Sequence, residues 1–492
     1  MAYLGWRSLG WPLIHDAPLF HYIGWLLTQG AVPYRDIFDV NMPGVYLLHW
    51  ALVATVGASD VVWRLFDLAW LAGTCALVFG YLRPVAGWPA AAAGALLFAL
   101  HHLAGGAWRA GQRDFLLCLL LLSGASGVAR AWEGRGALQP LWWSGLALGA
   151  GMMIKPLAGL FWLGCAVAGA LGARRAGRSP LAGAGAVLAS GLVVPAAVLG
   201  WLGWRGGLGP FLWVLTGYVL PLYGHVGRVS VWQAIGWHRY GWAILGLLAA
   251  LGAAGLAARL RPGFEIRRAL AAMGVLYGVV HLAVQGKGWE YHQYPLMFFL
   301  CVLAATALGP EAFAAWRWPR VLPAPGRVAA LGLLAALVVV LDAKGLDAMD
   351  PRWMGEKERR VSAVVRDLGP ILRDPRAGVA AGRPVTVQVM DLTEGGIHAL
   401  LRLGVRQPTR FIYDFHFSHD ATDPRIRALR AEFVAGLEAV PPAAIVVFPY
   451  VWITTGYERL AALPEIRALL ERAYTLAVEG DGYRIYAKRA GS

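Results

Sequence analysis

The first 344 positions of this chain are strongly apolar, and only eleven acidic residues occur in them. An ionisable group at the depth of a bilayer is costly and marks a functional site by default, whereas one at loop depth carries a weaker presumption. The eleven acids are Asp16, Asp36, Asp39, Asp60, Asp67, Asp114, Glu133, Glu265, Glu290, Glu311 and Asp342.

Acids and bases gather on one expected side of a membrane. A carboxylate can serve as a general base, and positive charges beside it can bind a phosphate. The topology that the arginine clusters predict places acids and bases together on the outer side of the membrane. They are Asp16, Asp36, Asp39, Asp114 and Glu290, with Arg35, Arg113, Lys155, Lys287 and His292.

The composition predicts that these residues are carried by membrane helices. The chain has 492 residues, of which 58% are hydrophobic and 15% charged, and its mean hydropathy is +0.53. Soluble domains have about 25% charged residues. These values exclude a disordered chain, a secreted disulfide scaffold and an ordinary soluble enzyme, and they indicate a multi-pass membrane protein.

The net charge of +15 divides unevenly between two domains. Residues 1–344 carry +13, because acids are scarce there, and residues 345–492 carry +2. No Lys/Arg run with interleaved aromatics occurs in the sequence, so we expect no nucleic-acid partner. We therefore predict a membrane domain over 1–344, with its first external loop at 15–62, and a soluble domain over 345–492.

Apolar runs long enough to span a bilayer need about 20 residues. Ten such runs, joined by some short loops, lie at 63–83, 86–103, 114–131, 139–155, 157–173, 181–203, 236–257, 268–286, 293–309 and 327–343. Arginine clusters occupy alternate connections, which predicts that these are cytoplasmic and that the tail is extracytoplasmic. The clusters begin at Arg83, Arg130, Arg174, Arg259 and Arg317.

Two segments near the start are ambiguous. Residues 43–57 are apolar but short, and a crossing there would turn every later arginine cluster outward, so we predict a helix at the outer interface. Only 14 residues precede His15, which is short for a span. We expect that the first helix is clipped or that the stated start lies downstream of the true one. The four cysteines lie inside apolar runs, which favours buried hydrophobes over a disulfide or zinc site.

The tail alternates strand and helix patterns, which predicts a small α/β domain. Strands are expected at 385–391, 409–415 and 443–450, the last of them central because it is continuously apolar. The segment 474–489 predicts a hairpin that turns at Gly480-Asp481-Gly482. Helices are expected at 395–403, 424–440 and 456–473, the last despite its proline. Gly395-Gly396 lacks the rest of a phosphate-loop fingerprint and is interpreted as a helix start.

The loop HDAPLFHYIGWLLTQGAVPYRDIFDVNMPG at residues 15–44 is the most specific motif. It resembles the first external loop of the glycosyltransferase C superfamily, in particular the 39-like and 83-like branch. That branch includes protein mannosyltransferases and the lipid A aminoarabinose transferase. These membrane enzymes take a sugar from a polyprenyl phosphate carrier. The resemblance covers the whole membrane part and is compatible with the external tail.

The resemblance implies roles for particular residues. Asp16 matches the family's catalytic base, although the second acid that often follows is here Ala17. The family's Lys-Pro-Pro is replaced by Asn41-Met42-Pro43, so another cation must bind the donor phosphate, and Arg35 is the nearest in sequence.

Three later motifs complete the resemblance. The second external loop ends in GAWRAGQRDFLL and places Asp114, preceded by Arg113, at the family's second acidic site. Lys155-Pro156 matches a Lys-Pro break between helices. The late loop QGKGWEYHQYP adds Lys287, Glu290 and His292 near the carrier phosphate.

The implied reaction agrees with simple chemistry. Moving a sugar from a phosphate to a hydroxyl needs a base for the acceptor proton and positive charge for the departing phosphate. One carboxylate suffices for an inverting displacement, because a phosphate leaves without protonation. A divalent cation, Mg²⁺ or Mn²⁺, could bind between Asp16, Asp114 and the phosphate. The acceptor would be a glycan, a lipid or a protein at the outer face of a bacterial inner membrane.

Each candidate also has a structural interpretation. Asp16 could cap a helix, Arg35 could form a salt-bridged turn with Asp36 and Asp39, and Arg113-Asp114 could anchor a helix end. Lys155 could extend to the interface. Among the remaining histidines, His101 and His102 are expected to be interfacial, and His21, His49 and His281 are expected to be packed or interfacial.

Two other functions compete with the transferase. A transporter or flippase of lipid-linked sugars would account for the helices and buried charges, but no convincing internal repeat occurs, and it leaves the acidic outer loop unexplained. A non-catalytic membrane scaffold of the same fold is favoured by the missing Lys-Pro-Pro.

Overall fold

The structure is a computed structural model that describes residues 2–134, 137–257, 265–307, 332, 335–340, 351–374, 384–452 and 454–489. The described chain is mostly helical with a small sheet near its C-terminal end. It divides into two compact units. Unit 1 comprises Met1–Trp11, Trp63–Val198 and Arg228–Met349, and unit 2 comprises Pro12–Val62, Leu199–Gly227 and Asp350–Ser492. The predicted border at 344/345 lies outside the described residues.

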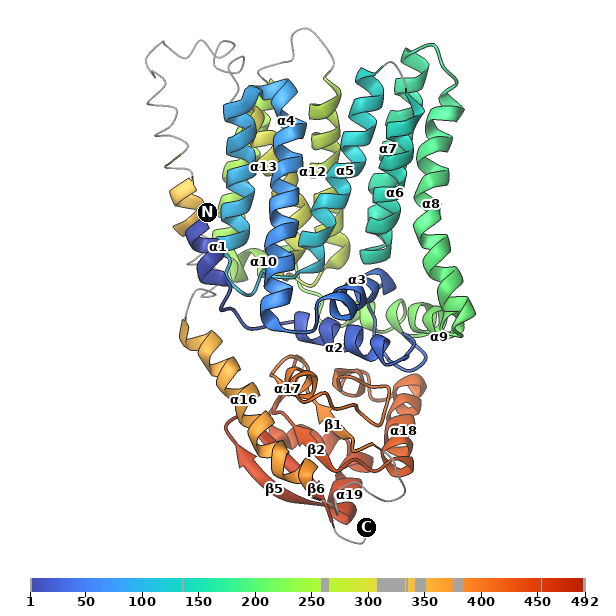
Figure 1. Cartoon of the computed structure of the whole chain (residues 1–492), viewed down its shortest axis with the longest axis vertical. Helices are drawn as coiled ribbons and strands as arrows, with labels where there is room; N and C mark the ends of the chain where they lie inside the picture. Colours follow the sequence, from blue (N-terminus) through green and yellow to red (C-terminus); the bar gives the residue numbers. More distant parts are fainter. Residues whose placement is uncertain are drawn as a thin grey trace. The chain divides into compact units, whose positions relative to one another are not determined.

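Unit 1 is built from long apolar helices that run side by side (Figure 1). Its helices are α1 (Ala2–Ser8), α4 (Asp60–Ala104), α5 (Arg113–Glu133), α6 (Leu138–Ile154), α7 (Ala158–Arg175), α8 (Pro180–Trp204), α10 (Val231–Trp237), α11 (Arg239–Ala257), α12 (Ile266–Gln285), η3 (Glu290–Gln293) and α13 (Tyr294–Thr306). Helices α4 and α8 begin or end just inside unit 2.

The predicted spans coincide with these helices in the described chain. Four of them, α4, α5, α8 and α12, are long and apolar enough to cross a membrane. Helix α4 covers the first two predicted runs and bends at Gly87, which has a φ of +78°. Gly87 lies between Pro84 and Pro89. The predicted span at 327–343 lies mostly outside the described residues. The number of spans and the side that each loop faces stay predictions.

Glycines let the helices of unit 1 approach closely, as small residues do in lipid. A Cβ added to Gly145 on α6 would collide with Ser190 Oγ and the Val187 carbonyl of α8, and would lie 2.8 Å from the Gly191 nitrogen. The backbones of α6 and α8 are therefore in contact at this point, and no larger residue fits without moving a helix.

Unit 2 joins the first loop to the tail. Its helices are α2 (Ala17–Thr28), α3 (Pro43–Thr55), α9 (Leu208–Trp213), the π-helix η1 (Val214–Val219), η2 (Tyr223–His225), α16 (Pro351–Arg373), α17 (Gly396–Leu403), η4 (Phe415–Phe417), α18 (Pro424–Ala439), η5 (Tyr457–Ala462) and α19 (Pro464–Ala473). Helices α2 and α3 pack tightly, because a Cβ on Gly24 would lie 2.8 Å from the His49 carbonyl carbon. The segment 43–57 is thus a helix, and its interfacial position stays a prediction.

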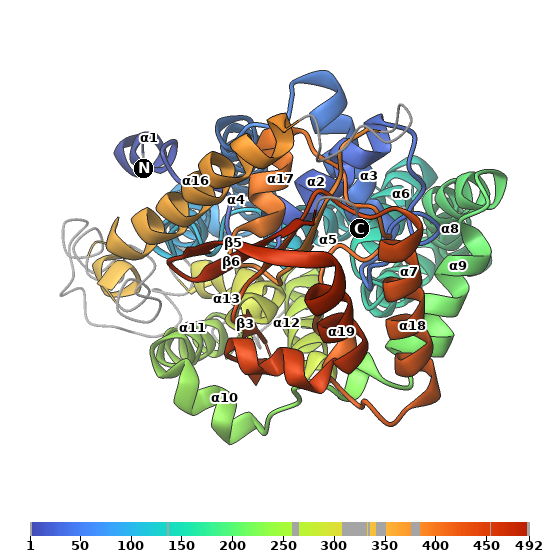
Figure 2. The same ribbon diagram turned by 90° about the horizontal axis from the view of Figure 1, so that it is seen from below.

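The tail contains a four-stranded sheet in the order β1-β2-β6-β5, from β1 (Val387–Met390), β2 (Ala444–Val447), β5 (Tyr474–Gly480) and β6 (Tyr483–Lys488). Strand β2 is central, as predicted: it pairs parallel to β1 and antiparallel to β6. Gly482, with φ +79°, makes the turn of the predicted hairpin. Helix α16 lies along this hairpin (Figure 2), where Tyr483 donates a hydrogen bond to Asp367. A second, two-stranded sheet pairs β3 (Tyr450–Val451) with β4 (Thr454–Thr455).

The predicted strand at 409–415 is wrong. Its carbonyls are bound by groups other than the backbone of a neighbouring strand of this sheet. The Arg410 carbonyl accepts from the Phe38 nitrogen at 2.7 Å, and the Phe411 carbonyl accepts from the side-chain Nε2 of Gln388 on β1 at 3.1 Å. The segment is apolar because its side chains are buried, with Phe411, Ile412 and Tyr413 each at most 3% exposed.

The predicted helix at 456–473 is two helices. Helix η5 ends at Ala462, and Leu463 separates it from α19. Proline lacks the amide hydrogen that a helix interior requires but suits its first turn. Pro464 therefore begins α19.

The contact between α6 and α8 can be tested by Gly145→Val. We expect this change to lower the free energy of unfolding by about 1–3 kcal/mol, because the side chain forces two backbones apart. Gly185→Val on α8 is the control, since nothing lies within 4 Å of a Cβ there. Thermal unfolding in detergent measures both, and equal melting temperatures would contradict the contact.

Candidate active site

Asp114 is fully buried in the first turn of α5 and is bound by two nitrogen-bearing side chains. Lys155 Nζ lies 3.1 Å from Asp114 Oδ2, and His281 Nε2 lies 2.6 Å from Oδ1. Burial of a carboxylate without a charged partner costs several kcal/mol. The three residues come from α5, the α6–α7 break and α12, so this interaction joins three helices.

The Lys-Pro break positions Lys155. Helix α6 ends at Ile154, and Lys155 is extended, with φ −143° and ψ +117°. The residue before a proline is disfavoured in helical conformation, so Pro156 ends the helix here. Lys155 is only 5% exposed, so the interpretation that it extends to the interface is wrong.

The late loop contributes Lys287 and His292. Gly286 and Gly288 flank the lysine with φ of +61° and +69°, a left-handed backbone that glycine adopts without strain. Lys287 is 5% exposed, and its Nζ lies 5.5 Å from the centre of the Trp289 ring. His292 is 2% exposed, and its ring lies 6.4 Å from that of His281.

The electrostatics of this loop show an excess of positive charge. Burial lowers the pKa of Lys287 to about 7, and the positive charges of Lys155, Arg113 and Arg228 lower it further in the same direction. Burial and Lys155 also lower the pKa of His292 well below its usual value. The carboxylate of Asp114 faces these residues. We name Arg113, Lys155, Lys287 and His292, together with Asp114, the cation cluster.

Within the part of the chain that the structure describes, no hydrogen-bond partner reaches the buried Nδ1 of His292. Its burial and the surplus positive charge around it favour an anionic ligand over a further cation. The cation cluster is therefore suited to binding an anion such as a phosphate group.

Asp16 lies in unit 2, at the residue before α2. Its side chain makes no capping hydrogen bond to that helix, so the helix-cap interpretation is not realised. His15 Nδ1 lies 3.4 Å from Asp16 Oδ1. His15 itself has φ +58°, an uncommon backbone for a residue with a side chain, and such strain often occurs at functional sites.

The remaining first-loop candidates form a local turn. Arg35 Nη2 lies 2.7 Å from Asp36 Oδ2, and Arg35 also donates to the Arg205 carbonyl. Asp36 accepts from the Val32 nitrogen, and Asp39 accepts from the Asn41 nitrogen. Arg35 and Asp36 realise the salt-bridged interpretation, whereas Asp39 is bound by Asn41. Arg35 belongs to unit 2 and not to the unit of the cation cluster.

Glu290 pairs with His238. The distance from His238 Nδ1 to Glu290 Oε2 is 3.1 Å. Arg113, Asp114, Lys155, Lys287 and His292 thus share unit 1, whereas Asp16, Arg35, Asp36 and Asp39 share unit 2.

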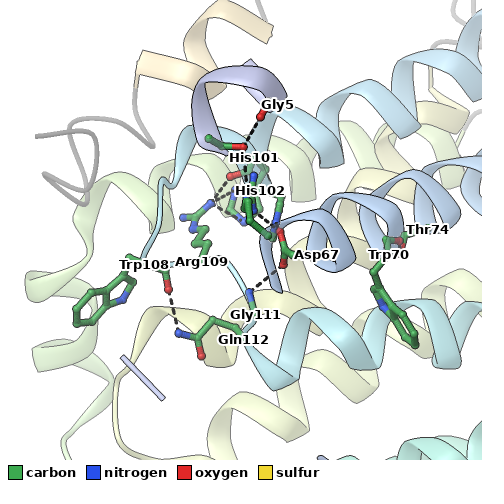
Figure 3. A network of polar contacts seen from close by, with 12 residues as sticks. Gly5, Asp67, Trp70, Thr74, His101, His102, Trp108, Arg109, Gly111 and Gln112 are labelled. Carbon is green, nitrogen blue, oxygen red and sulfur yellow. Dashed lines mark hydrogen bonds and ion pairs between the residues drawn. The ribbon is translucent and has the colours of Figure 1, made fainter. Parts of the chain in front are cut away.

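Sequence reasoning missed several buried polar residues of unit 1. His281 is packed, as expected, but it also binds Asp114. His102 is 1% exposed, so its predicted interfacial position is wrong, and it binds Asp67 (Figure 3). Arg64 and Asp67 form an ion pair at i,i+3 on α4. Two opposite charges at this spacing in an apolar helix were the available signal.

The described residues contain no group of three or more His, Cys, Asp or Glu that could hold a metal ion. The predicted site is of another kind, because it uses two acids and the phosphate, and it stays a prediction. Asp114 directs its oxygens to Lys155 and His281. We therefore derive no step through a metal.

Comparisons with known proteins agree with this architecture. Residues 41–204, which include Asp114 and Lys155, match the family model of dolichyl-phosphate-mannose-protein mannosyltransferase. The crystal structure of ArnT from Cupriavidus metallidurans bound to undecaprenyl phosphate is similar with a TM-score of 0.60 and 14% identity, covering 100% of this chain and 97% of that one. The chain has the glycosyltransferase C fold. The resemblance inferred from the loop at 15–44 is thereby confirmed.

Two further structures share the glycosyltransferase C fold with this chain. The apo state of the same ArnT has a TM-score of 0.54 at 14% identity, covering 99% of this chain and 96% of that one. The oligosaccharyltransferase AglB from Archaeoglobus fulgidus, in complex with an inhibitory peptide and a dolichol-phosphate, has a TM-score of 0.50 at 13% identity, covering 98% of this chain and 72% of that one. No curated protein gives a significant match.

The electrostatics of the cation cluster can be tested through Lys287. We expect its proton to be lost near pH 7, far below the ordinary value of 10.5. Lys155→Ala should raise this midpoint, because removing a neighbouring positive charge favours the protonated amine. The midpoint is measured from the pH dependence of Lys287 acetylation, followed by mass spectrometry.

Arg178→Ala is the control for that titration, since this exposed arginine at the end of α7 is absent from the charges that act on Lys287. It should leave the midpoint unchanged. A wild-type midpoint near 10.5, or equal shifts in both variants, would contradict the cation cluster.

Proposed function

We propose that the chain is an inverting glycosyltransferase that moves a sugar from a polyprenyl phosphate carrier to a hydroxyl group of a glycan, lipid or protein. The observation that carries this proposal is the cation cluster, a buried set of positive charges in a unit of apolar helices. Such a set suits a ligand whose phosphate is charged and whose tail is lipid. The glycosyltransferase C fold and relatives solved with undecaprenyl or dolichol phosphate support the same ligand class.

In this proposal the cation cluster acts on the donor. The sugar–oxygen bond to the phosphate breaks, and its electron pair stays on the phosphate. Lys155, Lys287 and Arg113 stabilise the charge that develops there, in a buried environment where such interactions are strong. Asp114 does not react itself: it holds Lys155 and His281 in place.

Asp16 acts on the acceptor. As the acceptor oxygen forms its bond to the anomeric carbon, the Asp16 carboxylate takes the hydroxyl proton. A single displacement inverts the anomeric centre. The acceptor gains the sugar, the carrier leaves as polyprenyl phosphate, and the proton resides on Asp16 until water removes it.

Lys287 responds to the charge of the donor. A lysine with a pKa of about 7 is half neutral at neutral pH in the empty protein. A bound phosphate favours its charged form and raises that pKa, so binding above pH 7 takes up a proton. The positive charge is thus complete when the phosphate is bound.

The sidedness of the reaction is also a proposal. We place the tail and the external loops on the outer face of a bacterial inner membrane, because the arginine clusters occupy alternate loops. Reporter fusions after residues 177 and 345 should be active in the cytoplasm and outside it, respectively. A cytoplasmic reporter at 345 would contradict this arrangement.

The reaction itself is tested with the purified full chain, labelled polyprenyl phosphate sugars and candidate acceptors. We expect Asp16→Asn to lower kcat about 10²–10⁴-fold, because the amide cannot take a proton. Lys155→Ala should raise the KM for the donor about tenfold or more. Formation of glycosylated acceptor and release of polyprenyl phosphate are both measured.

Asp423→Asn is the matched control, since this half-buried residue of unit 2 caps α18 through the Arg425 nitrogen and an amide can do the same. It should keep wild-type activity. Full transfer by Asp16→Asn, or no transfer with any donor, would overturn the proposal. Movement of the lipid-linked sugar across vesicles without transfer would instead identify a transporter.

A further inference from the structure

We propose that Asp67, His102 and Tyr294 form a positioning chain for the cation cluster and thereby set the affinity for the carrier phosphate. The identity of the ligand as a phosphate rests on the proposed function, whereas the geometry of the positioning chain does not. None of the three residues belongs to the cation cluster. Their hydrogen bonds lead to two of the three segments that supply its cations, namely the loop before α5 and the loop before α13. The third segment is the α6–α7 break, which carries Lys155.

Asp67 holds the first segment. Its Oδ1 accepts a hydrogen bond from the Gly111 nitrogen at 2.8 Å, as Figure 3 shows. Gly111 has φ +75°, and a Cβ there would collide with the Trp63 indole, so only glycine fits this turn. The turn lies two residues before Arg113. Asp67 therefore determines where α5 begins and where Arg113 and Asp114 are placed.

His102 links the two segments. Its Nε2 lies 2.9 Å from Asp67 Oδ2, and its Nδ1 lies 2.7 Å from the Tyr294 hydroxyl. Since an ionised carboxylate only accepts, Nε2 donates to Asp67 and Nδ1 accepts from Tyr294. The imidazole also stacks on Phe115, the residue after Asp114, with ring centroids 4.0 Å apart.

Tyr294 holds the second segment. It is the first residue of α13 and follows His292 by two positions. The hydrogen bond to His102 fixes the point at which the late loop, with Lys287 and His292, passes into the helix. Because Tyr294 is 1% exposed, water does not replace this hydrogen bond.

The placement of these charges also favours a positioning role. A buried ion pair is costly and is a poor source of stability, so its usual value is to specify one arrangement. Arg64 already partners Asp67, and Arg64 Nε donates to Ser8 Oγ at 2.8 Å. An ion pair between Arg64 and Asp67 with a purely structural role would need no partner beyond Ser8. The additional bonds of Asp67 and His102 go to two of the three segments that carry the cation cluster.

Tyr294→Phe tests the positioning chain, because it removes one hydroxyl and leaves the ring. Tyr81→Phe is the matched control. Tyr81 is also 1% exposed in unit 1, and it donates a hydrogen bond to the Arg267 carbonyl at 2.6 Å, which is not part of the positioning chain. Binding of undecaprenyl phosphate to the full chain in detergent is measured by thermophoresis, together with the melting temperature. We expect Tyr294→Phe to weaken binding about 3–10-fold and Tyr81→Phe less than about twofold, at similar losses of stability.

A second measurement needs no carrier. The pH midpoint of Lys287 acetylation reports how closely the cations approach one another, and Tyr294→Phe should shift it while Tyr81→Phe should not. Phe115→Leu, which removes the stacking on His102, should shift it as well and serves if Tyr294→Phe does not fold.

The outcomes separate the two proposals. Equal binding and equal midpoints in Tyr294→Phe and Tyr81→Phe would overturn the positioning role and leave the proposed function standing. No binding of undecaprenyl phosphate by the wild type, together with a shifted midpoint in Tyr294→Phe, would overturn the proposed function and keep the positioning role.

Discussion

The buried carboxylate of Asp114 imposes the main constraint on unit 1. A charge inside apolar helices must be partnered, and here the partners are Lys155 at 3.1 Å and His281 at 2.6 Å. They come from two other helices, so satisfying one carboxylate brings three helices together. The same arrangement gathers more positive than negative charge, because Lys287 and Arg113 approach the same place. An imbalance of this kind is unfavourable in an empty protein and favourable once an anion binds.

Unit 2 is held together by hydrogen bonds between segments far apart in sequence. The Tyr22 hydroxyl on α2 donates to the Val405 carbonyl at 2.9 Å, and Asp60 binds both His398 and Arg402 of α17. The first loop is therefore one body with the tail, and Asp16 is carried on that body. This organisation gives the tail a direct structural role in supporting the candidate base, beyond any contact with an acceptor.

The sequence predicted much of the fold because its signals are local. Apolar runs identify helices, a continuous apolar strand identifies the centre of a sheet, and Lys155-Pro156 or Gly482 ends an element wherever it stands. The failed strand at 409–415 shows the limit. Its middle residues, Phe411 to Tyr413, are buried as those of β2 are, yet Gln388 and the Phe38 nitrogen bind its carbonyls, and such distant partners leave no local pattern.

The sequence by itself determined that this chain has apolar helices with few charges, an α/β tail and a loop of glycosyltransferase C type. It also identified Asp114, Lys155, Lys287 and His292 as candidates, since an isolated charge beside an apolar run is costly and is retained for a partner or a function. Only the tertiary structure decided which of them meet. It separated Arg35, bound to Asp36, from the cation cluster, and it added His281, Asp67 and His102. The physical reason is that pairing of buried charges depends on helix packing across long stretches of chain, which residue type and spacing do not encode.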